Sequence, residues 1–376
     1  MPFQRTRISF IFTTMFLISF ASACGSPTPE PSANAEPSAN TEPSTGPEAQ
    51  NVVLPADKFD LTHWKITVPV DLNGDNKVDS ISQSDLASYS HPDFFHLDQY
   101  QRLVFTAPNK AITTKNSSNT RSELRYMSKE PKSKISSKDH ANNFSLKAHP
   151  KAQEFASIGG KMEATLHVDA VALNAGKPEK FPAYSAVVGQ IHAVKFSGLH
   201  VSSGWGNEPL KIYYKKWPNH EKGSVFWTYE RNLAKADPQR RDIAYPVWGN
   251  TWDISDNPGD QGIALGEEFS YTVNVYQNIM TLTFETENHE TIRYEIDLSN
   301  NIDANGKVDS EDNPIGYSGD SMYFKAGIYD QCSTSDADGF WYAACAGTGD
   351  WKTDHANGDF ARATFSRLVV SDATPN

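Results

Sequence analysis

The sequence predicts an all-β sandwich or jelly roll for the folded part of the chain. Short segments of alternating apolar and polar residues, rich in Val, Ile, Thr, Tyr and Phe, lie between clusters of Gly, Pro, Asn and Asp. Long helical periodicity is nearly absent, and no repeat of blade length favours a propeller. Short helical pieces are expected near 82–88 and 231–237. The candidate strands are 61–68, 101–107, 121–127, 161–168, 184–194, 210–216, 224–230, 269–276, 279–285, 291–297, 321–330 and 361–370.

Residues 1–24 have the pattern of an export signal. Arg5 and Arg7 precede an apolar run at 8–20, which is too short for a comfortable membrane span, and small residues then lead to Cys24. We expect a lipoprotein-type signal in which Cys24 becomes the lipidated first residue, although Ala21 stands where Leu is usual. The alternative is an ordinary cleaved signal with an incidental cysteine.

Residues 25–51 form a segment rich in Pro, Ser and Glu, in which Glu-Pro-Ser recurs at Glu30, Glu36 and Glu42. Such a segment buries too little apolar surface to offset the entropy of ordering, so we expect a disordered tether. The expected location is therefore exported, as an outer-membrane or cell-surface lipoprotein that touches the membrane only through Cys24. A periplasmic or secreted location is the alternative.

Residues 52–376 are expected to form one domain, which we expect to be monomeric. The chain carries a net charge of −12; residues 1–24 contribute +2 and residues 25–51 contribute −4, so the domain carries −10. An acidic surface argues against nucleic acid as a partner.

The sequence has three cysteines. With Cys24 assigned to the lipid anchor, Cys332 and Cys345 are the two in the folded domain. An exported protein lies where disulfides persist, so we expect these two to pair. Two buried free thiols are the alternative.

Three predicted strands carry polar side chains on one face and apolar side chains on the other, because successive strand residues point to opposite sides. In the last of them, Phe324, Ala326 and Ile328 form the apolar face. In the other two, Leu124 and Ile191 oppose the polar residues. The polar faces hold Arg121, Glu123 and Arg125 in the first strand, Gln190 and His192 in the second, and Tyr323, Lys325, Gly327, Tyr329 and Gln331 in the third.

Taken singly, each polar face has an ordinary explanation: a surface ion-pair ladder, a satisfied histidine, a packed tyrosine. Together they supply what β-elimination on a uronic acid needs. A cation and hydrogen-bond donors neutralise the carboxylate, a base removes the proton on C5, and an acid protonates the oxygen that leaves C4. Arg matches a carboxylate bidentately, Gln donates, and His and Tyr transfer protons. This chemistry requires neither a metal nor an organic cofactor.

At these motifs the sequence resembles the alginate lyases of polysaccharide lyase family 7. The motifs are Arg121-Ser122-Glu123-Leu124-Arg125, Gln190-Ile191-His192 and Tyr323-Phe324-Lys325-Ala326-Gly327-Ile328-Tyr329-Asp330-Gln331, and all occur in the family's order. The stretches 64–69, 209–216 and 223–227 also look like family strands, so the resemblance covers most of residues 57–370. It implies a concanavalin-like β-jelly roll whose concave sheet binds alginate.

The resemblance also implies roles for individual residues. Arg121 and Gln190 would neutralise the substrate carboxylate, His192 would be the base for guluronate, and Tyr329 would be the acid. For mannuronate, Tyr329 could serve as both base and acid. Positions that line the substrate groove in the family match Glu123, Arg125, Lys325 and Gln331.

Three further points concern the substrate groove. Ile191 tends in the family to accompany activity on guluronate-containing blocks, whereas Val accompanies mannuronate preference. Asp330 stands where many family members have Asn; it points away from the catalytic face, so we expect little consequence. The predicted strand 210–216 presents Lys211, Tyr213 and Lys215 on one face, either as additional groove surface or as a solvated edge.

Two Asp-rich segments, 71–79 and 303–309, resemble parts of a calcium loop, but turn chemistry explains both better. Two alternatives to an alginate lyase also stay open. One is a lyase for another polyuronate such as glucuronan, and the other is a non-catalytic carbohydrate-binding surface lipoprotein.

Overall fold

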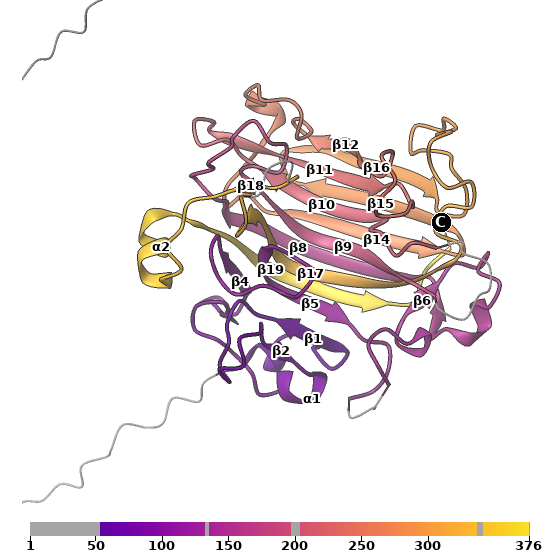
Figure 1. Ribbon diagram of the computed structural model, residues 1–376, viewed down its shortest axis with the longest axis horizontal. Coiled ribbons are helices and arrows are strands. Elements are labelled where there is room, and N and C mark those ends of the chain that lie inside the picture. Colours follow the sequence, from indigo (N-terminus) through magenta and orange to yellow (C-terminus); the bar gives the residue numbers. More distant parts are fainter. Residues whose placement is uncertain (1–52, 132–134, 197–203, 337–340, 376) are drawn as a thin grey trace, which may run out of the picture. The chain divides into compact units, whose positions relative to one another are not determined.

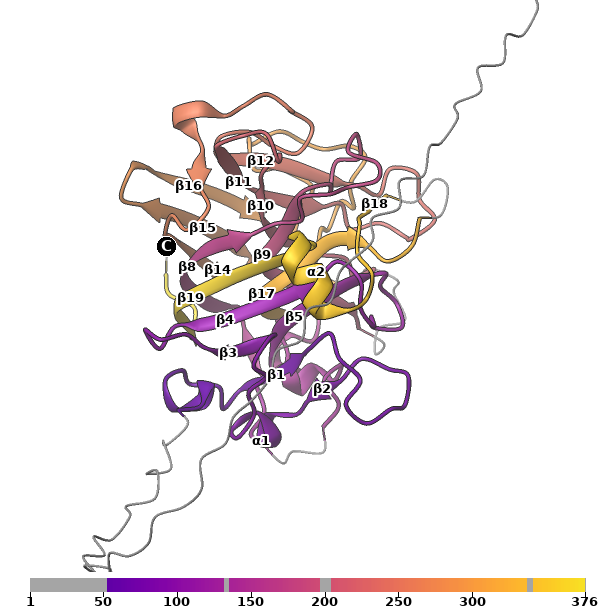
Figure 2. The same ribbon diagram turned by 90° about the vertical axis from the view of Figure 1, so that its left-hand side faces the viewer.

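Two β-sheets packed face to face make up the fold (Figure 1). The structure is a computed structural model that describes residues 53–131, 135–196, 204–336 and 341–375. The predicted signal, its Cys24 and the tether lie outside these residues, so they stay predictions. In the view of Figure 2 the strands of the two sheets separate into two layers, with β16, β15, β14 and β8 on the left and β12, β11, β10 and β9 on the right.

The larger sheet has 12 strands within the described residues. Its main path runs β12 (Asp242–Trp248), β11 (Lys222–Glu230), β10 (Leu210–Lys215), β9 (Ser185–Lys195), β17 (Asp320–Ser333), β5 (Asn119–Tyr126), β1 (Trp64–Thr67) and β2 (Ser80–Ile81). Short strands join it at β13 (Ile263–Ala264), β18 (Ala343–Ala344), β6 (Phe144–Ser145) and β7 (Ser157–Ile158). All pairs along the main path are antiparallel.

The smaller sheet has seven strands within the same residues and is antiparallel throughout. Its order is β16 (His289–Asp297), β15 (Ile279–Thr286), β14 (Phe269–Tyr276), β8 (Gly160–Ala170), β19 (Phe360–Ser371), β4 (Leu103–Pro108) and β3 (Phe95–Leu97). The helical segments are α1 (Gln83–Leu86), α2 (Trp351–Asn357), and the 3-10 turns η1 (Pro55–Asp57), η2 (His140–Asn142), η3 (Ala152–Glu154) and η4 (Gly259–Gln261).

The core lies between the sheets and is built from the apolar face of each strand. Leu124, Ile191 and Phe324 come from the larger sheet, and Phe105 and Phe365 come from the smaller one. The rings of Phe105 and Phe365 meet edge-on with centroids 5.2 Å apart. Each such side chain stabilises the fold by roughly 1.5–3 kcal/mol relative to exposure. Burial of these faces leaves the polar faces of β5, β9 and β17 on the other side of the larger sheet.

Two glycines allow close approaches beside the polar face. Gly327 has a φ of +134°, and a Cβ there would lie 2.5 Å from the carbonyl oxygen of Ser122. At Gly189 a Cβ would lie 2.6 Å from the hydroxyl of Tyr271, which reaches across the core. The pairing of β17 with β9 shifts just before Tyr329, and glycine is the residue that tolerates such an irregularity.

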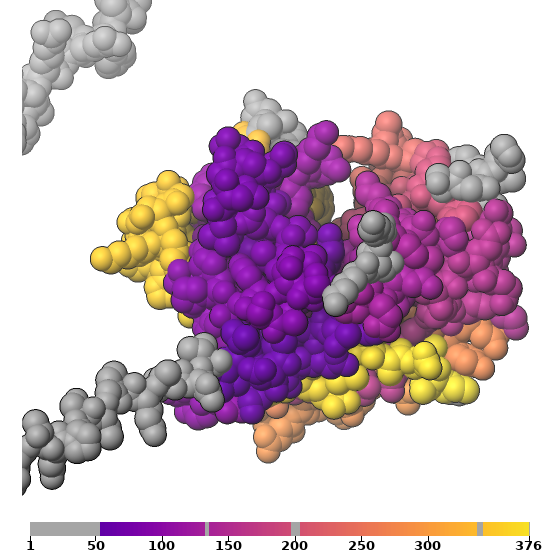
Figure 3. Space-filling model, turned by 90° about the horizontal axis from the view of Figure 1, so that it is seen from below, coloured from indigo at the N-terminus to yellow at the C-terminus, as the bar shows by residue number. Residues whose placement is uncertain are grey.

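Helix α2 lies at one end of the sandwich, in yellow (Figures 1 and 2), and projects at the left when the molecule is seen from below (Figure 3). Asp350 caps its first turn by accepting from the backbone N–H of Thr353, and Gly358 ends it at a φ of +75°.

Near the same end, the predicted disulfide joins Cys332 of β17 to Cys345 just after β18. This bond fixes the chain only three residues beyond Tyr329.

The structure has a strand in each of the twelve segments predicted from the sequence, with bounds that differ by a few residues. The predicted helix at 231–237 is wrong. Asn232 is buried and its side chain donates to Asp320 and to the carbonyl of Gly316, which holds the segment in turns instead. The sequence reasoning also missed β12. Pro246 argues against a strand, but β12 is an edge strand, where proline is tolerated.

The two Asp-rich segments form turns. Asp71 accepts from the backbone N–H groups of Asp75 and Asn76, and Asp303 accepts from those of Asn305 and Lys307. Among the described residues, no group of three or more His, Cys, Asp or Glu side chains is arranged to hold a metal ion. No helix in the same part of the chain is long and apolar enough to cross a membrane.

Candidate active site

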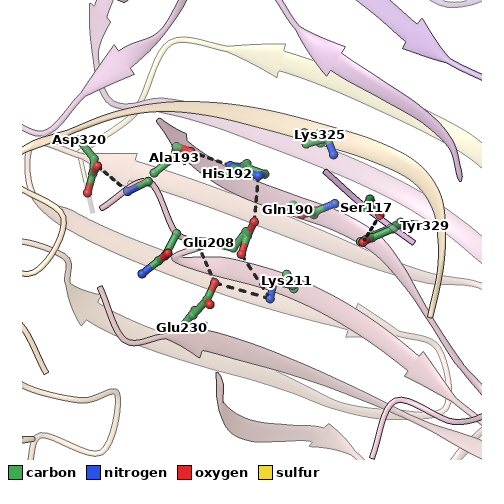
Figure 4. Close-up of polar contacts among 12 residues, drawn as sticks. Ser117, Gln190, His192, Ala193, Glu208, Lys211, Glu230, Asp320, Lys325 and Tyr329 are labelled. Atoms are coloured by element: carbon green, nitrogen blue, oxygen red, sulfur yellow. Dashed lines mark hydrogen bonds and ion pairs between the residues drawn. The ribbon is translucent and has the colours of Figure 1, made fainter. Parts of the chain in front are cut away.

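Three neighbouring strands bring the four predicted catalytic residues together. Strand β17 lies between β9 and β5, and Tyr329 of β17 is paired with Arg121 of β5. Lys325, four residues earlier on β17, is paired with Gln190 of β9. Together with His192, these side chains line a cavity of about 640 Å³. Figure 4 labels Gln190, His192, Lys325 and Tyr329 among them. The face assignment made from strand alternation therefore holds for all four.

Glu123 lies beneath the cavity and contacts two of the cations and one of the hydrogen-bond donors that line it. Its side chain is 3% exposed, and its Oε2 is 3.0 Å from Nη1 of Arg121. Lys325 forms a second ion pair with it, and Nε2 of Gln190 donates to its Oε1. Burial acts to raise the pKa of the Glu123 carboxyl, but Lys325 and Arg121 lower it further, to below its ordinary value. Glu123 is thus an ionised anchor for these side chains rather than part of the cavity wall.

Lys325 is itself buried, and burial lowers its pKa to about 8 against the opposing effect of Glu123. A lysine with this pKa carries most but not all of its charge near neutral pH.

Tyr329 is held between Arg121 and Ser117. The Arg121 guanidinium carbon lies 4.0 Å from the centroid of the Tyr329 ring. The Ser117 hydroxyl is 3.1 Å from the Tyr329 hydroxyl, and it accepts from Nη2 of Arg121 at 3.1 Å and from the backbone N–H of Asn119 at 3.1 Å. The single hydrogen of the Ser117 hydroxyl has two oxygens within reach, the Tyr329 hydroxyl and the carbonyl oxygen of Asn119 at 3.3 Å. A cation over the ring and a hydroxyl beside its oxygen therefore surround the side chain that would exchange protons with substrate.

His192 makes two contacts through its ring nitrogens. Nδ1 is 2.7 Å from the carbonyl oxygen of Ala193, and Nε2 is 2.8 Å from Oε1 of Glu208. The ring stacks on Tyr323 with centroids 5.3 Å apart and planes 7° from parallel. The guanidinium of Arg125 packs over the same Tyr323 ring at 3.8 Å.

Lys211 also lines the cavity and sits in an acidic cluster that the sequence did not reveal. Its Nζ is 3.0 Å from Asp242 and 3.6 Å from Glu208. Arg240 in turn binds Glu230 at 2.7 Å. Burial raises the pKa of Asp242, and Lys211 opposes that rise. Burial lowers the pKa of Lys211, but Asp242 and its neighbours raise it well above the ordinary value, so Lys211 keeps its charge.

Like Glu123, four further residues predicted to line the groove do not lie on the cavity wall. Arg125 donates to Asn143 at 2.8 Å beside Tyr323. Gln331 is buried and donates to the carbonyl of Tyr329. Tyr213 lies beneath Trp252, whose ring centroid is 5.2 Å away. Lys215 donates to the carbonyl of Phe181 at 2.7 Å. Strand alternation gave the face of these residues but not the loops that cover it.

Most of the other lining residues come from loops, and the rest from the ends of strands, which period-two patterns do not describe. The loop between β11 and β12 contributes cations, and the segment before β18 contributes aromatic rings. These additional residues are Thr114, Asn116, Ser117, Ser118, Asn119, Glu208, Glu230, Lys235, Arg240, Arg241, Asp242, Trp341 and Tyr342. The Arg240-Arg241 pair was the sequence signal that could have indicated this wall. A domain that is acidic overall thus presents six lysine and arginine side chains at this cavity within the described residues.

The family model described as "Alginate lyase" matches residues 59–372 of the chain. The chain belongs to the alginate lyases of polysaccharide lyase family 7. An alginate lyase from Klebsiella pneumoniae is 34% identical over 335 residues, which cover 86% of this chain and 93% of that protein. The resemblance deduced from the three motifs is confirmed, and the chain is an alginate lyase.

Solved structures of alginate lyases share the fold. The crystal structure of the enzyme from Klebsiella pneumoniae has a TM-score of 0.66 at 30% identity, and that of the exolytic family 7 lyase AlyA5 from Zobellia galactanivorans has 0.68 at 30%. Each comparison covers 86% of this chain and 99% of the other. The family 7 lyase A1-II' matches at a TM-score of 0.51 and 21% identity, which supports the fold alone. The predicted β-jelly roll is confirmed.

Proposed function

We propose that this alginate lyase cleaves the 4-O-glycosidic bond by β-elimination in the cavity lined by Arg121, Gln190, His192 and Tyr329. The observation that supports this most is the convergence of these four side chains, from three neighbouring strands, on one cavity. One cavity then holds a carboxylate-neutralising pair and two proton-transfer groups, which is the set that elimination requires.

Arg121 and Gln190 are proposed to hold the uronate carboxylate. Arg121 already directs Nη1 to Glu123 and Nη2 to Ser117, which orients the guanidinium plane. Each Nη group uses one hydrogen in these contacts and has a second hydrogen that can donate to the carboxylate. Gln190 uses one amide hydrogen on Glu123 and has a second for the same carboxylate. Neutralising the carboxylate stabilises the enolate-like transition state at C5.

The proton transfers are assigned to His192 and Tyr329. For guluronate, His192 accepts the C5 proton and Tyr329 protonates the leaving oxygen. For mannuronate, Tyr329 accepts the C5 proton and then gives it to the leaving oxygen. In both cases the C5–H electron pair forms the C4–C5 double bond, and the C4–O pair leaves with the glycosidic oxygen. Ile191 supports a lean toward guluronate-containing blocks. Alginate oligosaccharides are bound in two structures of the relative A1-II', as product (GGG) and substrate (GGMG).

The activity is tested by replacing Tyr329 with Phe. The variant keeps the ring that packs on Arg121 but loses the hydroxyl, so turnover should fall at least about a thousandfold while alginate binding is largely kept. Turnover is followed by the near-ultraviolet absorbance of the unsaturated product. Unchanged turnover would defeat the assignment. A non-catalytic carbohydrate-binding protein predicts no unsaturated product from the parent enzyme either.

The polymer is tested by incubating the parent enzyme with polyguluronate, polymannuronate and glucuronan. We expect product from alginate blocks, with the faster rate on guluronate-containing ones. Product from glucuronan alone would favour the other polyuronate lyase.

We also propose that the enzyme is an exported monomeric lipoprotein, anchored through Cys24 and separated from the membrane by residues 25–51. The order of an apolar run, small residues, cysteine and a repetitive tether supports this. Cys24→Ser should move the protein from the membrane fraction to the soluble fraction. Membrane association that does not change in this variant would count against lipidation, and a dimeric elution volume of the purified domain would count against a monomer.

A further inference from the structure

A second cavity, of about 490 Å³, opens where the β1 side of the larger sheet meets the smaller sheet. The pairing of β19 with β4 ends where Phe365 meets Leu103, and the cavity lies beside the next residues of β19, 366–370. The start of β1 with the loop before it, the tip of the β3–β4 turn and the end of β5 supply the other walls. This edge cavity is separate from the catalytic one, because no side chain of the described residues lines both.

The edge cavity lies on the opposite side of the larger sheet from the catalytic residues. Tyr126 of β5 lines it, five residues after Arg121, and successive strand residues point to opposite faces. Tyr126 therefore points, with Leu124, to the side on which the core lies. Its ring packs edge-on against Trp64, with centroids 5.2 Å apart, and both residues form part of the wall. A ligand in the edge cavity consequently contacts none of the catalytic side chains.

Tyr100 lines the edge cavity and is the most exposed aromatic residue in the described part of the chain, at 68%. The turn that carries it is held by Asp98, which accepts from the backbone N–H of Tyr100 at 2.8 Å and binds the Arg102 guanidinium at 2.7 Å. Gln101 at the tip has a φ of +61°, a left-handed conformation that residues other than glycine rarely adopt. The turn is therefore fixed before any ligand binds, and it holds a large apolar ring in solvent, where the ring is available for stacking.

Two cations line the same cavity, although the domain as a whole is acidic. Lys58 is exposed, and no carboxylate of a described residue lies within ion-pair distance of it. Arg367 is half exposed, and its contact with Glu163 is a long one, at 3.6 Å. Within the described residues, Asp60 is the one carboxylate in the lining, so the two cations exceed the anions there. The edge cavity therefore favours an anionic ligand.

We propose that the edge cavity is a second, non-catalytic binding site for alginate, in which a sugar ring stacks on Tyr100 and uronate carboxylates contact Lys58 and Arg367. Its volume lies within the range of about 300–1,000 Å³ that is usual for ligand pockets. Alginate is the polymer that this enzyme degrades, and every sugar in it carries a carboxylate, so one chain matches both the ring and the cations. A chain held here raises the local concentration of further linkages at the catalytic cavity. The proposal rests on the membership of the alginate lyases and does not depend on the roles assigned to His192 and Tyr329.

The test compares a long polymer with a short substrate. In the double variant that combines Tyr100→Ala with Lys58→Ala, kcat/KM on polymeric alginate should fall about five- to tenfold, because the polymer loses its second attachment. An alginate tetrasaccharide gains nothing from a second attachment, so its kcat/KM should stay within about twofold of the parent. Polymer binding is measured separately by the retardation of Tyr329→Phe, with and without the two substitutions, in native gels that contain alginate. The two substitutions should raise the apparent Kd for the polymer about tenfold.

Two single variants serve as matched controls. Tyr100→Phe keeps the ring and should bind the polymer like the parent. Lys352→Ala removes an exposed positive charge on α2 that lines neither cavity, and it should leave both rates unchanged. Polymer binding and rates that stay at the parent's values in the double variant would overturn the proposal. An equal loss on polymer and tetrasaccharide would also overturn it, because the substitutions would then act through the fold. Failure of the proposed mechanism is a separate outcome, which appears as turnover retained in Tyr329→Phe.

Discussion

Asp330 offers a prediction that can be worked out from its burial. The side chain is fully buried, Oδ1 accepts from the backbone N–H of Cys332 at 3.1 Å, and Oδ2 has no hydrogen-bond partner among the described residues. Burial raises the pKa of this carboxyl from 3.8 to about 8, although the backbone hydrogen bonds from Cys332 and Gln331 act to lower it. Asp330 is therefore protonated in the native enzyme at neutral pH.

The raised pKa makes stability depend on pH. Below about pH 4 both the native and the unfolded Asp330 are protonated, and the carboxyl makes no difference. Between about pH 4 and 8 only the unfolded form ionises, so the free energy of unfolding falls by up to 1.36 kcal/mol per pH unit. The full gap of about four units gives a loss on the order of 5 kcal/mol, which levels off above pH 8.

Asp330→Asn resembles the protonated carboxyl in shape and cannot ionise. We expect the variant to be close to the parent in stability near pH 4 and to exceed it by several kcal/mol near pH 8. Denaturant unfolding with the disulfide intact, at a series of pH values, measures both curves. Asp260→Asn, an exposed carboxyl, serves as the control. Parallel curves for the parent and Asp330→Asn would refute the reasoning, because they would mean that the native carboxyl is ionised.

Three further perturbations act on the scaffold of the site. Glu123→Gln leaves Arg121 and Lys325 buried without their shared anion. The free energy of unfolding, measured in urea, should therefore fall by about 3 kcal/mol, and turnover, measured by product absorbance, should be lost. A free energy of unfolding within about 0.5 kcal/mol of the parent would contradict this. Cys332→Ser removes the disulfide between two cysteines that are 13 residues apart in the sequence. The free energy of unfolding should fall by about 2–4 kcal/mol, seen as a lower midpoint of thermal unfolding. An unchanged midpoint would count against this prediction. Ser117→Ala removes the hydrogen-bond partner of the tyrosine hydroxyl, so kcat should fall about tenfold with KM nearly constant. A change in KM alone would assign the serine to binding.

Strand alternation was enough to predict the sandwich and the face on which the main site residues lie. An apolar face must be buried, and this requirement fixes the side to which Arg121, Gln190, His192 and Tyr329 point. The alternation of side chains does not predict the register between neighbouring strands as directly. The irregular pairing at Gly327 keeps Tyr329 opposite Arg121, and a glycine in a strand signals such an irregularity only in general.

The remainder of the site depends on contacts between distant segments, which a single sequence does not encode in any local pattern. Glu208 reaches His192 because β10 pairs with β9, and Lys211 meets Asp242 across β11. The burial of Tyr213 under Trp252 likewise depends on a loop from elsewhere in the chain. Asp330 was expected to matter little because it points away from the catalytic face; its burial without a partner for Oδ2 gives it a consequence for stability instead.

In the proposed mechanism, one alginate residue binds with its carboxylate on Arg121 and Gln190 and with its C5 within reach of Tyr329. The most direct measurement is a crystal structure of Tyr329→Phe, with the oligosaccharide left uncleaved in the cavity. We predict carboxylate oxygens within about 3 Å of Arg121 and Gln190, and C5 within about 4 Å of the ring edge of residue 329. A uronate carboxylate bound instead to Lys235 or Arg241, with its C5 away from residue 329, would contradict the account.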